Sequence, residues 1–172
     1  MPSKTPNKAI RAAALDNPFQ ITKFFPFRLT VMSNLLTQRV ADVYAGRFGL
    51  SAYEWRVIGL LAEAGPIPSA DVIAQVAMDK VRVSQTVAKL LKLEYITRDS
   101  DPLDRRRAVL SLTPQGVAIY DQIVPLVREA EIELMHGLSP RERSSLEAIV
   151  TKLEVHIRKL RRFTRRSDAS AS

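Results

Sequence analysis

The sequence lacks the residues on which several classes of protein depend. Its 172 residues include no cysteine, so a disulfide framework, a thiolate metal site and a thiol-based redox sensor are excluded. The two histidines, His136 and His156, lie far apart in sequence and make a poor zinc site without cysteine. We therefore expect no metal and no cofactor.

The chain also has little glycine and no long hydrophobic run. Its six glycines form no Gly-x-Gly-x-x-Gly loop, no Walker lysine motif and no Gly-x-Ser-x-Gly elbow, so we expect the protein not to be an enzyme. No apolar run approaches the ~20 residues of a membrane-spanning helix. The first residues lack the apolar core and cleavage pattern of a signal peptide, and we expect a cytoplasmic protein.

Positive charge is what the sequence has in excess. Lys and Arg number 26 against 18 Asp and Glu, which gives a net charge of +8 and a pI of about 10.1. Such a balance favours an anionic partner, either nucleic acid or an acidic membrane.

Hydrophobic periodicity and capping residues predict a mainly helical chain with a small β-hairpin. Apolar residues recur at three and four from Ile21 to Phe48, which predicts one long helix. Four further helices are expected to begin after Ser51, at Ser69, after Asp79 and after Thr113, followed by a last one after Ser139. Between the third and fourth of these, "YITRDS" and "RRAVLSLT" alternate like the two strands of a hairpin.

This order predicts a winged helix-turn-helix flanked by long N- and C-terminal dimerisation helices. The amphipathic terminal helices need a partner, and a second copy of the chain is the simplest one. The expected boundaries are a flexible arm at 1–17, the N-terminal helix at 18–48, the DNA-binding domain at 49–113, the C-terminal helices at 114–165 and a flexible tail at 166–172.

The helix from Lys80 to Lys92 has the pattern of a DNA-reading helix. On a helical wheel, Val83, Val87, Leu90 and Leu91 point inward, and the opposite face carries cations, an amide and small groups but no acid. Arg82 or Lys89 suits guanine, Gln85 adenine, and Val81 a thymine methyl group, while Ser84 and Thr86 suit phosphates. The predicted contact residues are Lys80, Val81, Arg82, Ser84, Gln85, Thr86 and Lys89. The alternative is a solvated basic helix face.

The stretch "DSDPLDRRRAVLSLTPQG" places three arginines at the tip of the hairpin. A tip that follows such a helix lies beside its groove, where Arg105, Arg106 and Arg107 reach phosphates or the negative minor groove. An acid there is unfavourable unless it pairs with an arginine, and Asp104 is placed to do so. The alternative is a solvated turn.

These residues resemble a known family. "DPLDRRRAVLSLTPQG" is similar to the wing of the multiple antibiotic resistance regulator (MarR) family, "MDKVRVSQTVAKLLKLEYITR" to its recognition helix, and "LSAYEWRVIGLLAEAG" to its second helix. The resemblance covers about residues 29–120, and Gln85 departs from the arginine of many members. It implies a homodimeric transcription factor, usually a repressor, that binds a pseudo-palindromic operator and is released by a small ligand. By the same likeness, Arg106 enters the minor groove and Asp104 holds it.

Family pockets lie between the dimerisation helices and the winged-helix lobe. Here "KFFPFRLTVMSN" and "YEW" are the candidate lining, with aromatic walls and one cation that suit an aromatic carboxylate or phenolic acid. The candidate residues are Phe24, Phe27, Arg28, Met32 and Trp55. The alternative is that these residues form ordinary core.

Two other functions remain open. An architectural DNA-binding dimer without a ligand would share every predicted DNA contact. Attachment to an anionic membrane through "RKLRRFTRR" explains the basic tail but leaves the wing and the recognition helix unexplained, so we expect no membrane partner.

Overall fold

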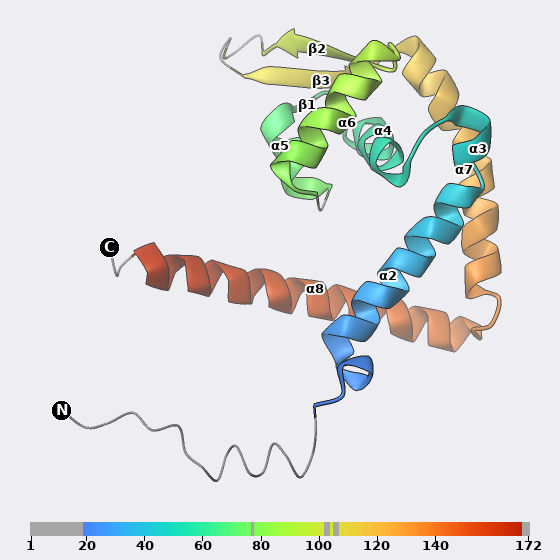
Figure 1. Ribbon diagram of the computed structural model, residues 1–172, viewed down its shortest axis with the longest axis vertical. Coiled ribbons are helices and arrows are strands. Elements are labelled where there is room, and N and C mark those ends of the chain that lie inside the picture. Colours follow the sequence, from blue (N-terminus) through green and yellow to red (C-terminus); the bar gives the residue numbers. More distant parts are fainter. Residues whose placement is uncertain (1–18, 77, 102–103, 105–106, 170–172) are drawn as a thin grey trace. The chain divides into compact units, whose positions relative to one another are not determined.

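The computed structural model describes residues 19–76, 78–101, 104 and 107–169, without the side chains of 161–169. The chain divides into two compact units, residues 1–121 and 122–172, which are described separately (Figure 1). No helix in the described part of the chain combines the length and the hydropathy that a bilayer span requires.

The first unit is a winged helix-turn-helix preceded by a long helix. Its elements in chain order are η1 (Ile21–Lys23), α2 (Phe25–Asp42), α3 (Ala45–Phe48), α4 (Ala52–Ala64), β1 (Ile67–Pro68), α5 (Ser69–Gln75), α6 (Lys80–Lys92), β2 (Ile96–Ser100), β3 (Ala108–Leu112) and the first turns of α7 (Pro114–Met135). The second unit contains the rest of α7 and all of α8 (Pro140–Ala169). The winged helix-turn-helix fold predicted from the sequence is confirmed.

The helices begin at the capping residues that the sequence predicts. Ser51 and Glu54 form a capping box on α4, and Asp79 accepts a hydrogen bond from a backbone N–H in the first turn of α6. Thr113 caps α7 through the backbone N–H of Gly116 at 2.9 Å, and Ser139 begins α8 with a second capping box. Each cap satisfies backbone groups that a helix end leaves unpaired.

The core of this unit joins the recognition helix and the wing to one scaffold. Four side chains of this core are fully buried: Val57 and Ile58 of α4, Leu90 of α6 and Leu110 of β3. Helix α4 contacts both α6 and β3, and β3 lies between β1 and β2 in an antiparallel sheet. Figure 1 shows the hairpin beside α6, so the two candidate DNA-contacting elements belong to the same packed unit.

The structure corrects two expected boundaries and adds one strand. The N-terminal helix ends at Asp42 instead of Phe48, because the chain turns there to bury Tyr44 and then forms the separate α3. The sheet has a third strand, β1, whose two residues are too few to show alternation. Helix α8 continues to Ala169, past the boundary expected at residue 165.

The start of α7 approaches the turn between α6 and β2 so closely that only glycine fits. A Cβ on Gly116 would collide with the Tyr95 carbonyl oxygen and lie 2.9 Å from the Tyr95 carbonyl carbon. The same carbonyl oxygen accepts the Thr113 N–H at 3.0 Å, so this backbone cannot move aside without losing a hydrogen bond.

We therefore expect Gly116→Ala to lower the free energy of unfolding by about 1–3 kcal/mol, because the backbone must shift to admit the methyl group. Gly59→Ala is the matched control, since a Cβ there meets nothing within 4 Å, and its expected change is zero to about 1 kcal/mol of stabilisation. Denaturant unfolding measures both values. Equal stability of the two variants would contradict the close approach.

Candidate nucleic-acid interface and ligand cleft

Helix α6 presents the predicted face to solvent. Its buried residues are Val83, Thr86, Val87 and Leu90. The exposed residues include all the other predicted contacts on this helix, which are Lys80, Val81, Arg82, Ser84, Gln85 and Lys89. Thr86 is a correction: it is 2% exposed, because its position lies three residues after Val83 and four before Leu90, within the buried stripe. Its hydroxyl therefore does not face a phosphate.

Lys89 is held by the first turn of α4. Its Nζ donates to the Gly49 carbonyl oxygen at 3.1 Å and lies 3.2 Å from Oε2 of Glu54. The Glu54 side chain is 8% exposed and the Lys89 side chain 44%. The same Oε2 accepts the Ser51 N–H at 2.6 Å. Base reading by Lys89 stays a prediction, and it competes with this ion pair.

Arg82 contacts the residue next to Glu54. Its guanidinium carbon lies 4.8 Å from the centre of the Tyr53 ring, within the range of a cation–π contact. Residues 82 and 89 are seven apart, so they lie on the same side of α6, the side toward the first turn of α4. The residues that point furthest from the core are Val81, Gln85, Ala88 and Lys92, all exposed.

The wing is described at its base and in part at its tip. Asp101 N–H donates to the Arg107 carbonyl oxygen at 2.9 Å, and Arg107 N–H donates to the Asp104 carbonyl oxygen at 2.8 Å. Arg107 also lies 3.9 Å from a carboxylate oxygen of Asp71, with both side chains half-exposed, an arrangement of little energetic weight. Arg105 and Arg106 lie outside the described residues, so the pairing of Asp104 with Arg106 stays a prediction.

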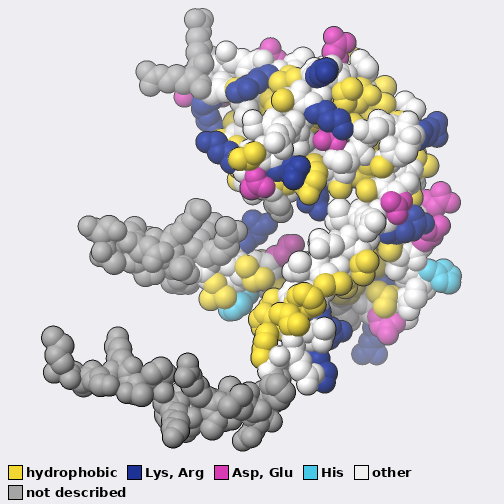
Figure 2. Space-filling view, in the orientation of Figure 1, with side chains coloured by type: hydrophobic (Ala, Val, Ile, Leu, Met, Phe, Trp, Pro, Cys, Tyr) yellow, Lys and Arg dark blue, Asp and Glu magenta, His cyan; other side chains and the backbone are white. Residues whose placement is uncertain are grey.

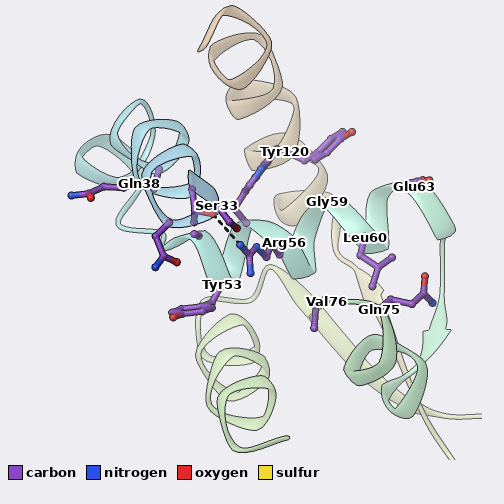
Figure 3. Close-up of a pocket in the computed structure, with 15 residues that line it drawn as sticks. Ser33, Gln38, Tyr53, Arg56, Gly59, Leu60, Glu63, Gln75, Val76 and Tyr120 are labelled. Carbon is purple, nitrogen blue, oxygen red and sulfur yellow. Dashed lines mark hydrogen bonds between the residues drawn. The ribbon is translucent and has the colours of Figure 1, made fainter. Parts of the chain in front are cut away.

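A large open cleft lies along α4 within the first unit. It has a volume of about 1010 Å³ and combines aromatic, polar and charged side chains (Figure 3). Its lining consists of Ser33, Asn34, Thr37, Gln38 and Ala41 of α2, Ala52, Tyr53, Trp55, Arg56, Gly59, Leu60 and Glu63 of α4, Gln75 and Val76 at the end of α5, and Tyr120 of α7.

Three aromatic side chains and one arginine are among the lining residues of this cleft. Trp55 stacks on Tyr120 with ring centres 5.7 Å apart and an interplanar angle of 16°, and the Tyr44 ring centre also lies 5.7 Å from that of Trp55. Arg56 donates to the Thr37 hydroxyl at 3.2 Å (Figure 3). Tyr44 itself lines a smaller adjoining cavity of about 280 Å³.

Tyr44 carries a buried hydroxyl. The residue is 1% exposed, and its hydroxyl has no hydrogen-bond partner among the described residues. Burial raises the pKa of Tyr44 to about 12, while the nearby Arg56 works against that rise. A buried donor without a partner is costly, so a ligand acceptor that reached it would gain a hydrogen bond.

Of the five residues predicted to line an effector pocket, Trp55 lies in the cleft. Phe24, Phe27, Arg28 and Met32 are exposed at the start of α2 and do not line it. The arginine in the cleft is Arg56, which the sequence reasoning missed. Its signal was a stripe on α4: Ala52, Arg56, Gly59 and Glu63 recur at three and four on the face away from the buried Val57 and Ile58.

In the described part of the chain, His, Asp and Glu side chains form no group of three or more that could hold a metal ion.

Glu54 makes stability depend on pH. Burial alone would raise the pKa of Glu54, but hydrogen bonds from Ser51 and Lys89 outweigh it and hold this pKa below its ordinary value of 4.5. The unfolded chain then takes up the proton more readily, so the carboxylate stabilises the fold above about pH 4.5. This contribution is lost as the pH falls through the lower folded pKa.

We expect Glu54→Gln to lower the free energy of unfolding by about 1–2 kcal/mol at neutral pH and to flatten its decline in acid. Glu142→Gln is the matched control, because Glu142 forms an equivalent capping box with Ser139 in an exposed position. Denaturant unfolding at several pH values measures both variants. An unchanged acid slope in Glu54→Gln, or the same neutral-pH loss in Glu142→Gln, would contradict this role.

Comparison with known proteins agrees with this architecture. A sequence model of the MarR family matches residues 48–107, which include α4, α5, α6 and β2. The HTH-type transcriptional repressor NicR of Pseudomonas putida is 27% identical over 104 residues, which is 60% of this chain and 66%, just under two thirds, of that protein.

Two solved structures share the fold over most of the chain. A MarR/EmrR family transcriptional regulator from Acinetobacter sp. ADP1 is 25% identical with a TM-score of 0.74, over 82% of this chain and 99% of its own. Bordetella bronchiseptica BpsR, solved in a study of how 6-hydroxynicotinic acid regulates its DNA binding, is 22% identical with a TM-score of 0.72, over 80% of this chain and 98% of its own. NicR and the Acinetobacter protein are named as regulators of transcription, not as enzymes. Over its winged helix-turn-helix segment the chain is therefore similar to the MarR family of transcriptional regulators, as the resemblance in its sequence predicted.

Proposed function

We propose that this protein is a cytoplasmic, homodimeric repressor that binds a pseudo-palindromic operator and is released by a small aromatic carboxylate or phenolic acid. The observation that carries the proposal is the exposed strip of α6, which consists of Val81, Gln85, Ala88 and Lys92. Cations flank this strip, and α6 packs beside the wing. Val81 and Gln85 on that strip suit a thymine methyl group and an adenine edge. Lys80 and Lys92 suit phosphates, and Arg105, Arg106 and Arg107 suit the neighbouring groove.

Exposed apolar side chains support a dimer. Hydrophobic residues gather along the first turns of α2 (Figure 2), where Phe25 is 54% exposed. Helix α8 separately exposes Leu146, Ile149, Val150, Val155, Ile157 and Leu160. Apolar faces of this extent mark association surfaces. A second copy would cover them, and two-fold symmetry would then set two recognition helices about one DNA turn apart.

The cleft supports release by a ligand. Arg56 offers a cation for a carboxylate, and the stacked Trp55 and Tyr120 offer walls for a ring. BpsR responds to an aromatic acid of this kind. An architectural DNA-binding dimer needs no such cleft, and this difference favours the ligand-responsive regulator.

The test uses a duplex selected from a random pool by the purified protein, with binding followed by fluorescence anisotropy. We expect two protomers per duplex and an affinity that falls steeply with salt. Benzoate, salicylate and 6-hydroxynicotinate serve as probes. At about 100 times its Kd, a binding acid should stabilise the protein by about 2.7 kcal/mol and release the duplex.

Arg56→Met should leave DNA binding unchanged. It should lower the affinity for the acid about 10-fold or more, because a charged hydrogen bond is lost. Arg28→Met is the matched control, since Arg28 does not line the cleft. If no probe changes stability or DNA affinity, the architectural alternative holds. If the protein does not bind duplex DNA at low salt, the proposed function is wrong.

A further inference from the structure

Tyr53 belongs to both candidate sites. Its ring lines the cleft, and the guanidinium of Arg82 on α6 lies over the same ring at 4.8 Å. Figure 3 shows Tyr53 projecting from α4 next to the pale green helix α6. The residue is 38% exposed, so its side chain is open to a molecule in the cleft as well as to Arg82.

A comparison with Glu54 shows why Tyr53 can respond to a molecule in the cleft and Glu54 cannot. Glu54 is buried and accepts hydrogen bonds from Ser51 and Lys89, so the Lys89 end of α6 is fixed to α4. Tyr53 holds Arg82 by its ring face, a contact that depends on the ring's orientation and is lost when the ring turns. A planar guanidinium on an aromatic face still has N–H groups free for a phosphate or a guanine.

We infer that Tyr53 positions Arg82 for DNA and transmits occupancy of the cleft to it. The inference rests on the proposed function and names the residue through which that function is regulated. A molecule seated against Tyr53 turns the ring, Arg82 loses its support, and DNA affinity falls without any rearrangement of the core. By linkage, bound duplex weakens binding in the cleft by the same factor.

The first test is a double-mutant cycle on binding to the selected duplex. Tyr53→Leu removes the ring and should lower affinity about two- to five-fold, the range of an exposed cation–π contact. Tyr53→Phe keeps the ring face and should bind as the parent does. In an Arg82→Gln background, Tyr53→Leu should cost nothing more. Equal losses in both backgrounds, or a Phe variant as weak as the Leu variant, would overturn the positioning role.

The second test fills the cleft without requiring a known ligand. Because the chain has no cysteine, Asn34→Cys on the α2 wall of the cleft can be labelled there alone with a benzyl methanethiosulfonate. Labelling should lower DNA affinity at least two-fold in this protein and by less in the Asn34→Cys/Tyr53→Leu variant. Gln115→Cys, exposed and outside the cleft, is the labelling control. The same loss with and without the Tyr53 ring would overturn the transmission.

The outcomes of the two tests distinguish failure of the Tyr53 transmission from failure of the proposed function. If labelling acts through Tyr53 while no small acid binds, the transmission stands and the proposed effector class is wrong. If acids release the duplex equally from Tyr53→Leu and from the parent, the effector class stands and the transmission is wrong. If no duplex is bound by any form, both are wrong.

Discussion

One oxygen atom, Oε2 of Glu54, ties the helix-turn-helix together. It accepts hydrogen bonds from the Ser51 N–H, the Ser51 hydroxyl and the Lys89 ammonium. A buried carboxylate is tolerable only with such partners. The same contacts end the loop before α4, begin α4 itself and fix one end of α6 against it. The orientation of the recognition helix therefore depends on a carboxylate in the helix that also forms a wall of the cleft.

This arrangement sorts the residues of α6 into two sets. Arg82 and Lys89 lie toward α4, over a tyrosine ring and beside a carboxylate. Val81, Gln85, Ala88 and Lys92 point away from the protein. Because Tyr53 and Glu54 contact α6 while Tyr53, Trp55 and Arg56 line the cleft, the residues proposed for DNA reading and for ligand binding meet within one turn of α4.

The features that depend only on neighbouring residues could be predicted from the sequence. The caps at Ser51, Asp79, Thr113 and Ser139 and the exposed face of α6 follow from hydrogen-bonding chemistry and helical period, and the structure confirms them. The wheel failed at Thr86 because a small polar residue inside a buried stripe gives no signal of its own. The sequence points to Arg28 and not to Arg56, because the meeting point of α2 and α4 depends on packing between distant segments. The tip arginines remain a prediction from the sequence.

The central claim is that α6 reads DNA with its outward strip while α4 holds its flanking cations. Selection of duplexes from a random pool by Gln85→Ala and by Lys89→Met tests it most directly. The account predicts that Gln85→Ala changes the preferred base at one position of each half-site, whereas Lys89→Met weakens all sequences alike and leaves the preference unchanged. A changed base preference in Lys89→Met, with none in Gln85→Ala, would contradict it.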